Sequence, residues 1–335
     1  MKKPPLICFL IMVILMACES DDVLFMEDLL SPVIFEGDSV TAYRDPAVLF
    51  ANDSFYLFFT LVEIEPDSMI YSYLAKSTSI DLKTWSPVKK LTPRNQHLNF
   101  SSPGNLIRFG DEWILCLQTY PRPGYHASQM PRYGSSDARI FIMRSKDLES
   151  WTDPTLLKVK GPDIAVENMG RMIDPYLVRD LSEPDKYWCF YKQKGVSMSY
   201  TYDLENWTFK GSTEAGENVC VLATEDEYIL FHSPANGIGI KRSKNLEDWK
   251  DYGKPITLGQ KEWSWAAGRL TAGFVLDEQI HPRIKNYIMF YHGSGPGDEQ
   301  INFDRNSSIG IAWSSDLINW MWPVDEDKLK DAREQ

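Results

Sequence analysis

SKDLESW, at residues 145–151, is one of five similar stretches in this chain of 335 residues. The other four are SIDLKTW at 79–85, TYDLENW at 201–207, SKNLEDW at 243–249 and SSDLINW at 314–320. Successive copies end on tryptophans that are 42 to 71 residues apart. Repeats at such spacings are typical of solenoids and propellers, in which one small unit is used several times.

Each position of the repeat suits a tight turn between two strands. The Asp or Asn can bond the backbone two residues further on and so begin a turn. The Leu is expected to turn inward, and the Trp to pack in the wedge between neighbouring sheets. Each copy is preceded by one apolar, strand-like run, at 55–60, 112–117, 187–191, 227–231 and 286–291. Such runs are expected where sheets pack on both faces.

No long segment has the 3.6-residue period of a helix, so the chain is predicted to be all-β. Five copies predict a five-bladed β-propeller that fills residues 33–325. The last repeat lies close to the C-terminus, so the short run 33–35 is expected to complete the final blade and close the ring.

The N-terminus has the pattern of a targeting segment. Lys2 and Lys3 precede an apolar run at 6–16, which is too short to span a bilayer comfortably. The run ends in LMAC at 15–18, which resembles a bacterial lipobox. We therefore predict a lipoprotein signal peptide at 1–17, a lipid on Cys18, an acidic tether at 18–32 and a polar tail at 326–335. The predicted location is the cell envelope, with the lipid as the only membrane contact; an ordinary secretory signal is the alternative.

The net charge of −12 argues against a nucleic-acid partner and favours a neutral ligand. A monomer is expected. The 11 Trp and 16 Tyr residues suit sugar binding, since flat rings stack on sugar faces. Three cysteines remain beyond Cys18, and each lies in an apolar run without metal-binding spacing. Cys116, Cys189 and Cys220 are therefore interpreted as small buried hydrophobic residues.

Three acidic residues are candidates for catalysis. Asp45 and Asp174 each precede a proline, and Glu217 begins a strand-like run. The gaps from these acids to an aromatic residue of the next run are 11, 13 and 11 residues, which predicts equivalent positions on the innermost strands of three blades. Cleavage of a glycosidic bond needs two such carboxyl groups, an acid and a base or nucleophile.

These motifs resemble glycoside hydrolase family 43, a family of inverting five-bladed propellers, over nearly the whole mature chain. The resemblance implies that Asp45 is the general base, that Asp174 tunes the pKa of the acid and orients it, and that Glu217 is the general acid. Family members usually have Glu-Gly-Pro around the acid, whereas this chain has Glu217-Asn218-Val219. Glu262 and, more remotely, Glu167 are reserve candidates. Families 32, 68, 117 and 130 share motifs of the Arg-Asp-Pro type, so membership near one of them stays open.

Six further residues are candidates for substrate binding. Arg44 and Arg269 would bond sugar hydroxyls, and the possible walls of the sugar site are Tyr120, His126, Trp263 and Trp265. Ion pairing of Arg44 and burial of the four wall residues between blades are the alternatives. Family 43 often has a Gly-His-Gly in blade five that helps to hold calcium, but this chain has AGRLT at 267–271. No metal ligands and no required cofactor are predicted, and a structural calcium without a clear histidine ligand stays open as an alternative.

The resemblance implies an exo-acting hydrolase that releases arabinose, xylose or a similar unit from a glycan. Two alternatives remain open. One is a non-catalytic carbohydrate-binding propeller of a glycan-uptake system. The other is a glycoside phosphorylase, which would need a cluster of basic residues for phosphate, and the sequence shows no such cluster.

Overall fold

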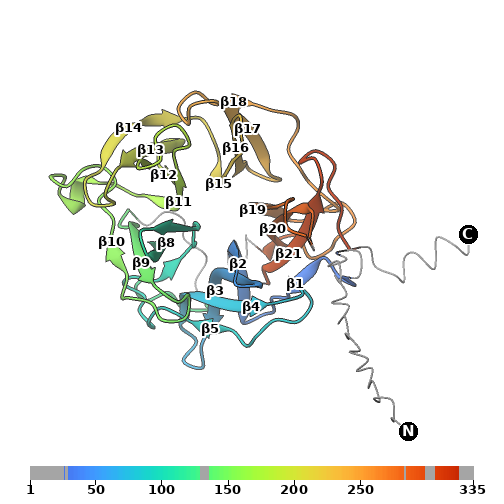
Figure 1. The fold of residues 1–335 in the computed structure, drawn as a ribbon. Helices are drawn as coiled ribbons and strands as arrows, with labels where there is room; N and C mark the ends of the chain where they lie inside the picture. The colour runs from blue at the N-terminus through green and yellow to red at the C-terminus, as the bar shows by residue number, and fades with distance from the viewer. Residues whose placement is uncertain (1–25, 27–28, 129–135, 283, 299–305, 324–335) are drawn as a thin grey trace, which may run out of the picture.

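A computed structural model describes residue 26 and residues 29–128, 136–282, 284–298 and 306–323. Its strands form five sheets arranged in a ring, which confirms the predicted five-bladed propeller (Figure 1). The predicted signal peptide, the polar tail and most of the predicted tether lie outside the described residues. Among these residues, no helix combines the length and apolar character needed to cross a membrane.

The five blades follow one another along the chain. Blade one consists of β2 (Thr41–Ala51), β3 (Ser54–Ile64), β4 (Ile70–Ser79) and β5 (Lys89–Lys90). Blade two consists of β6 (Phe100–Ser101), β7 (Leu106–Phe109), β8 (Glu112–Thr119), β9 (Ile140–Ser145) and β10 (Thr155–Leu156). Blade three consists of β11 (Ile173–Arg179), β12 (Tyr187–Lys192), β13 (Val196–Thr201) and β14 (Thr208–Thr213).

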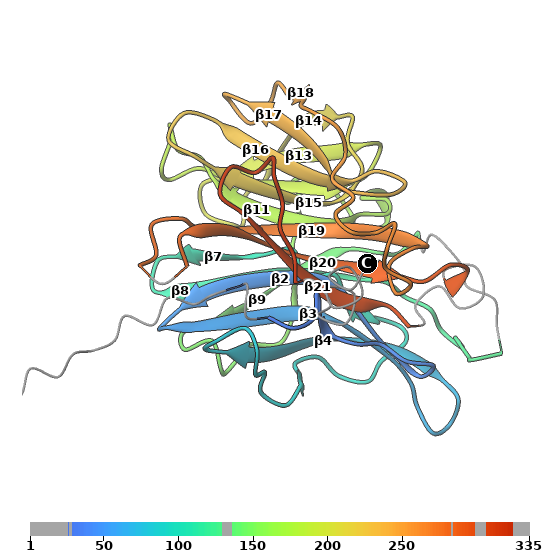
Figure 2. The ribbon, with the colours of Figure 1, turned by 90° about the vertical axis from the view of Figure 1, so that its right-hand side faces the viewer.

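Blade four consists of β15 (Glu217–Ala223), β16 (Tyr228–Ser233), β17 (Gly239–Ser243) and β18 (Lys250–Asp251). Blade five contains β19 (Arg269–Glu278), β20 (Asn286–Ser294) and β21 (Ser308–Ser314), and its outer strand is β1 (Val33–Phe35). Strand β1 pairs antiparallel with β21, so the start of the propeller closes the ring as predicted. The edge-on view shows β19 between the yellow blade four and the blue blade one (Figure 2).

The five repeats form the same turn. In the copy at 145–151, the Ser145 hydroxyl accepts the N–H groups of Asp147 and Leu148, and Asp147 accepts those of Glu149 and Ser150. In all five copies the Trp indole N–H donates to the Leu carbonyl at 3.0 to 3.3 Å. The leucines have φ between 61° and 65° and are all buried. This left-handed backbone costs roughly 1–2 kcal/mol, which burial of a leucine side chain, worth about 1.5–3 kcal/mol, offsets.

The repeat tryptophans join neighbouring blades. Trp151 of blade two packs edge-on against Phe58 of β3, with ring centroids 5.6 Å apart. Trp249 of blade four packs in the same way against Phe190 of β12, at 5.8 Å. In both cases the partner belongs to the preceding blade, so these tryptophans fill the predicted wedge between sheets. The free cysteines Cys116, Cys189 and Cys220 are buried as expected, and burial raises the pKa of each thiol.

Candidate active site

The innermost strands carry an irregularity at the same position. The register of β2, β11, β15 and β19 with the next strand shifts there, and the residue at the shift has a positive φ of 48° to 53°. In blade two Ser102, directly after β6, has φ 41°. We call these five residues the bulge ring: Asp45, Ser102, Asp174, Asn218 and Ala272. Bulges and left-handed non-glycine residues are concentrated at functional sites in proteins.

Hydrogen bonds between blades hold the bulge ring. The backbone N–H of Ser102 donates to Thr60 Oγ1 at 2.7 Å, and that of Asp174 donates to Gln118 Oε1 at 2.5 Å. The N–H of Ala272 donates to Ser233 Oγ at 2.7 Å. In each case the acceptor lies on the second strand of the preceding blade. Each of these inner strands is therefore fixed by its neighbour at the axis.

A hydrogen bond of the same kind joins blades five and one. The N–H of Asp45 donates to Nδ1 of His292, on β20, at 3.0 Å. Burial, and then the charges of Arg44 and Arg269, hold the pKa of His292 well below its usual value, so the ring is neutral and Nδ1 can accept. The junction of blades three and four differs. In blade three, Lys192 occupies the strand position that provides the acceptor in the other blades, and an ammonium group cannot accept a hydrogen bond. There the N–H of Asn218 lies 3.4 Å from Asp174 Oδ2.

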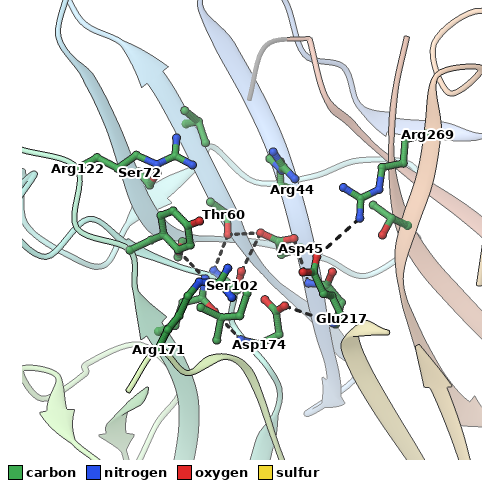
Figure 3. Close-up of a pocket in the computed structure, with 17 residues that line it drawn as sticks. Arg44, Asp45, Thr60, Ser72, Ser102, Arg122, Arg171, Asp174, Glu217 and Arg269 are labelled. Atoms are coloured by element: carbon green, nitrogen blue, oxygen red, sulfur yellow. Dashed lines mark hydrogen bonds and ion pairs between the residues drawn. The ribbon is translucent and has the colours of Figure 1, made fainter. Parts of the chain in front are cut away.

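A pocket of about 180 Å³ opens over the bulge ring. Asp45, Asp174 and Glu217 all line it, so the three candidate acids from blades one, three and four meet at one site (Figure 3). The residue before each bulge position also lines the pocket. We call this second set the entrance ring: Arg44, Ser101, Ile173, Glu217 and Thr271. Beneath the bulge ring lies a cavity of about 20 Å³ that no entrance-ring residue lines.

Asp45 is held by four polar neighbours. Its Oδ2 accepts hydrogen bonds from Thr60 Oγ1 at 2.9 Å and Ser102 Oγ at 3.0 Å (Figure 3). Its Oδ1 accepts one from Asn218 Nδ2 at 3.3 Å and lies 3.6 Å from His292 Nδ1. The side chain is 11% exposed. The carboxylate is therefore oriented by donors from blades one, two and four, while it still borders the pocket.

Asp174 is more deeply buried, at 7% exposure. Burial, followed by the negative charges of Glu217 and Asp45, raises the pKa of Asp174 to about 8. At neutral pH this side chain is thus a protonated carboxylic acid beside the Asp45 carboxylate. The resemblance implied instead that Asp174 would raise the pKa of Glu217.

Glu217 is not equivalent to the two aspartates, which corrects the prediction from residue gaps. Glu217 pairs with Ser233 just before the register shift, as Arg44 pairs with Thr60, and Asn218 occupies the bulge position of blade four. Glu217 therefore belongs to the entrance ring. Its side chain is 38% exposed, and Oε2 lies 3.8 Å from Nη2 of Arg269.

The error of one residue has an identifiable cause. The second strand of four blades contains an aromatic residue followed three positions later by a phenylalanine: 55–58, 187–190, 228–231 and 287–290. These phenylalanines pair with the residue two positions after each bulge. The gap of 11 residues from Asp45 ends at Tyr56, whereas the residue equivalent to Tyr228 of blade four is Phe55. The prediction therefore made Glu217 equivalent to Asp45, although Asn218 is. When Phe55 is used, Asp45 and Asn218 both lie ten residues ahead of the aromatic residue.

The other predicted residues divide into two groups. Arg44, Arg269 and Tyr120 line the pocket, but Trp263, Trp265 and His126 do not. The two tryptophans, which are partly buried, stack on each other and on buried Tyr291, with ring centroids 5.4 to 6.2 Å apart. This stacking removes apolar ring surface from water. His126 bonds Ser128, and its backbone bridges to Met69. The reserve acids Glu262 and Glu167 are exposed and also lie outside the pocket.

Several pocket residues were not predicted from the sequence. Arg122 and Arg171 join Arg44 and Arg269, so the pocket has four arginines where no basic cluster was visible in the sequence. Arg122 lies in the loop after β8, and no motif in the neighbouring sequence indicates that it lines the pocket. For Arg171 the only signal in the sequence is its place three residues ahead of Asp174. Ser102 had a sequence signal, because Ser102-Pro103 repeats the pattern of Asp45-Pro46 and Asp174-Pro175.

Blade five contains a histidine near the axis, His292, which lies on β20 and outside the segment 267–271. Its Nδ1 accepts the Asp45 N–H. The described residues contain no group of three or more His, Cys, Asp or Glu side chains placed to hold a metal.

No protein-family model matches the chain, and no curated protein matches its sequence. Solved structures do match. An exo-1,5-α-L-arabinanase from a bovine ruminal metagenomic library is 16% identical with a TM-score of 0.56, covering 83% of this chain and 95% of its own. The catalytic domain of the family 62 α-L-arabinofuranosidase of Coprinopsis cinerea is 14% identical with a TM-score of 0.60, covering 84% and 94%.

A thermostable family 43 glycoside hydrolase is 16% identical with a TM-score of 0.57, and the match covers 85% of this chain and 92% of that one. At these identities the likeness concerns the fold. The match covers 92% to 95% of the length of these three chains. This chain therefore shares the five-bladed propeller fold of the family 43 and family 62 glycoside hydrolases.

Proposed function

We propose that this protein is a glycoside hydrolase. One observation carries the proposal: Asp45 and Asp174 occupy the same bulge position in two blades, border one pocket, and both contact Asn218. The Asp45 carboxyl group accepts hydrogen bonds from Thr60 and Ser102, whereas the pKa of Asp174 is raised to about 8. Two carboxyl groups whose environments differ in this way suit a base and an acid in one reaction.

In the proposed mechanism, Asp45 takes a proton from water while the water oxygen attacks the anomeric carbon. The bond from that carbon to the leaving oxygen breaks, and Asp174 gives its proton to this oxygen. The products are a free sugar of inverted configuration and an alcohol. Inversion requires the two carboxyl groups to lie about 6.5–9.5 Å apart around the sugar and the water.

The resemblance assigns the proton donor to Glu217, whereas we assign it to Asp174, which shares the bulge position of Asp45 and is more deeply buried than Glu217. Asp174 carries a proton at neutral pH, because burial and two neighbouring acids disfavour its charged form. Glu217 lies in the entrance ring and faces Arg269. We assign Glu217 and Arg269 to binding sugar hydroxyls at the mouth of the pocket.

The pocket suits the end of a glycan chain. Its volume of about 180 Å³ is below the range of roughly 300–1,000 Å³ that is common for drug-sized ligands. One sugar unit and an exit for the leaving group fit this size better than a long groove would. The similar structures include an arabinanase and an arabinofuranosidase, so arabinosides and xylosides are the first substrates to examine.

The test uses aryl arabinofuranosides and xylosides with two leaving groups, one that needs protonation and one that leaves without it. Asp45→Asn should abolish turnover of both. Asp174→Asn should lose far more activity on the poor leaving group than on the good one, because only the poor one needs the acid. Glu217→Gln should affect both equally. A selective loss on the poor leaving group in Glu217→Gln would return the donor role to that residue.

A carbohydrate-binding propeller without turnover is the second candidate. The observation in its favour is Asn218, an amide at the bulge position where blades one and three have carboxyl groups. Wild-type protein that binds glycans but releases no sugar, in the same assays, would select this candidate.

We also propose that Cys18 anchors the protein to the cell envelope and that the propeller acts as a monomer. The lipobox-like LMAC at 15–18 supports the anchor. Labelling with radioactive palmitate in a bacterial host should mark the wild-type chain and not Cys18→Ser. Secretion of an unlabelled wild-type chain would favour the ordinary signal peptide.

A further inference from the structure

Four arginines line the pocket, although the protein as a whole is acidic. Arg44, Arg122, Arg171 and Arg269 line it, and they come from parts of the chain that are up to 225 residues apart. They face three acidic side chains, and one of these, Asp174, holds a proton at neutral pH. Guanidinium groups stay charged at any working pH. The lining of the pocket is thus net positive, although the chain carries −12.

Two of the arginines form a separate pair on one wall. The Arg122 guanidinium lies 4.8 Å from the ring centre of Tyr120, and the Arg171 guanidinium lies 5.7 Å from the same ring. Both enter on the left in Figure 3, opposite Arg269 and Glu217. Arg269 faces Glu217 at the mouth of the pocket and Arg44 lies beside His292, so both arginines have neighbours in the site described above. The Arg122–Arg171 pair has no such function in the mechanism.

In the part of the chain that the structure describes, Arg171 makes no close ion pair, although its charge reaches the more distant Asp174 and slightly counteracts the rise in the pKa of that group. Its Nε is buried and makes no hydrogen bond, and among the described residues no ion pair joins its guanidinium to an acid. Thr271, which is 1% exposed and lines the same pocket, also has a hydroxyl without a partner. Buried polar groups are nearly always bonded, and both residues line the pocket, so these two atoms leave hydrogen bonds that the protein itself does not supply. A neutral sugar offers hydroxyl groups to both, but only an anion offers charge to Arg171.

We propose that the pocket recognises a sugar acid, and that Arg122 and Arg171 bind the carboxylate of a uronic acid unit at the chain end. The planar guanidinium matches a carboxylate in two parallel hydrogen bonds. This inference rests on the proposed glycosidase function and defines its substrate class. It departs from the neutral ligand that the overall charge of the chain suggested, so uronides join arabinosides and xylosides as substrates to examine.

A phosphate ion is a poorer fit. In a phosphorylase the phosphate takes the place of the attacking water, and here that place adjoins Asp45. Asp45 is a carboxylate with its donors already in position, so it suits activation of water and repels an anionic nucleophile. The Arg122–Arg171 pair lies on the Tyr120 wall, where a substituent of the sugar would reach it.

Calorimetric binding tests the proposal without relying on turnover. The probes are glucuronate, galacturonate and mannuronate, each compared with glucose, galactose or mannose, which differ only at C6. At least one uronate should bind wild type about 10- to 100-fold more tightly than its neutral partner. Arg122→Gln and Arg171→Gln should bring this ratio close to one, and Arg171→Lys should keep part of it. Arg144→Gln, which removes an arginine on β9 paired with Glu112, is the matched control and should keep the full ratio.

Melting temperatures of all variants establish that they are folded. Equal affinity for uronates and neutral sugars, the absence of any sugar binding, or a preference that survives both Gln variants would overturn the proposal. Tighter binding of inorganic phosphate than of every uronate would also overturn it. If Asp45→Asn keeps its turnover, the hydrolase mechanism fails, while the uronate ratio still tests the carboxylate site independently.

Discussion

The side-chain amide of Asn218 lies 3.3 Å from a carboxylate oxygen of Asp45, across the axis between blades four and one. Both residues occupy the bulge position of their blade. Blade four thus supplies a neutral donor to Asp45 where a third carboxyl group would repel it.

Asn218→Asp should therefore move the acid limb of the activity profile upward by about one pH unit. A second carboxylate beside Asp45 disfavours its charged form, which is the form that activates water. The measurement is kcat/KM against pH. Asn218→Ala, which removes the donor without adding charge, serves as the control, and an equal shift in both variants would exclude a charge effect.

Asp174 should set the alkaline limit of the reaction. The acid must be protonated, and its pKa is about 8, so kcat/KM should fall as the pH rises through this value. The profile of wild type on a poor leaving group measures this limb. In Asp174→Asn the remaining activity should lack it. An alkaline limb that is unchanged in this variant would assign the limb to another group.

Asp174→Asn should also stabilise the fold. The pKa of Asp174 is raised in the native state, so the native protein binds more protons than the unfolded chain between about pH 4 and pH 8. The free energy of unfolding of wild type therefore falls as the pH rises through this window. The amide removes this loss, so the advantage of the variant should grow from pH 4 to pH 8 and then level off. Denaturant unfolding at several pH values measures it, and a constant difference would contradict the burial argument.

The repeat turn offers a matched pair of variants in blade two. Ser145→Ala removes the hydroxyl that accepts two backbone N–H groups, and should lower the free energy of unfolding by about 1–3 kcal/mol. Ser145→Thr should be nearly neutral, because Thr201 makes the same two bonds at this position in blade three. Urea unfolding compares them. Equal stability of both variants would mean that water replaces the hydroxyl without cost.

Ring closure should depend on β1. A variant that begins at residue 37 lacks the strand that pairs with β21, and it also lacks Phe35, whose ring lies 5.2 to 5.7 Å from those of Tyr43, Phe59 and Trp85. Its urea midpoint should fall clearly below that of a variant beginning at residue 26, which keeps β1. Equal midpoints would show that blade five is stable with three strands.

Much of the site was predictable, because it follows from position within a repeat. Asp45 and Asp174 were identified by their prolines and by their distance from a strand, and both border the pocket. Glu217 was placed one residue out of register, since spacing alone does not reveal a bulge. Trp263 and Trp265 were expected as sugar platforms, but they pack on Tyr291. Composition cannot distinguish a buried aromatic ring from one that faces a ligand.

The sequence by itself determined the number of blades, the turn that ends each one and the strand that closes the ring. These features depend on neighbours a few residues apart, whose hydrogen bonds and burial are local and repeat with the motif. Only the tertiary structure decided which side chains share the axis and what charge they create there. Arg44, Arg122, Arg171 and Arg269 lie far apart along the chain and meet only when the ring closes. The raised pKa of Asp174 likewise comes from burial and from acids of other blades, which no stretch of sequence contains.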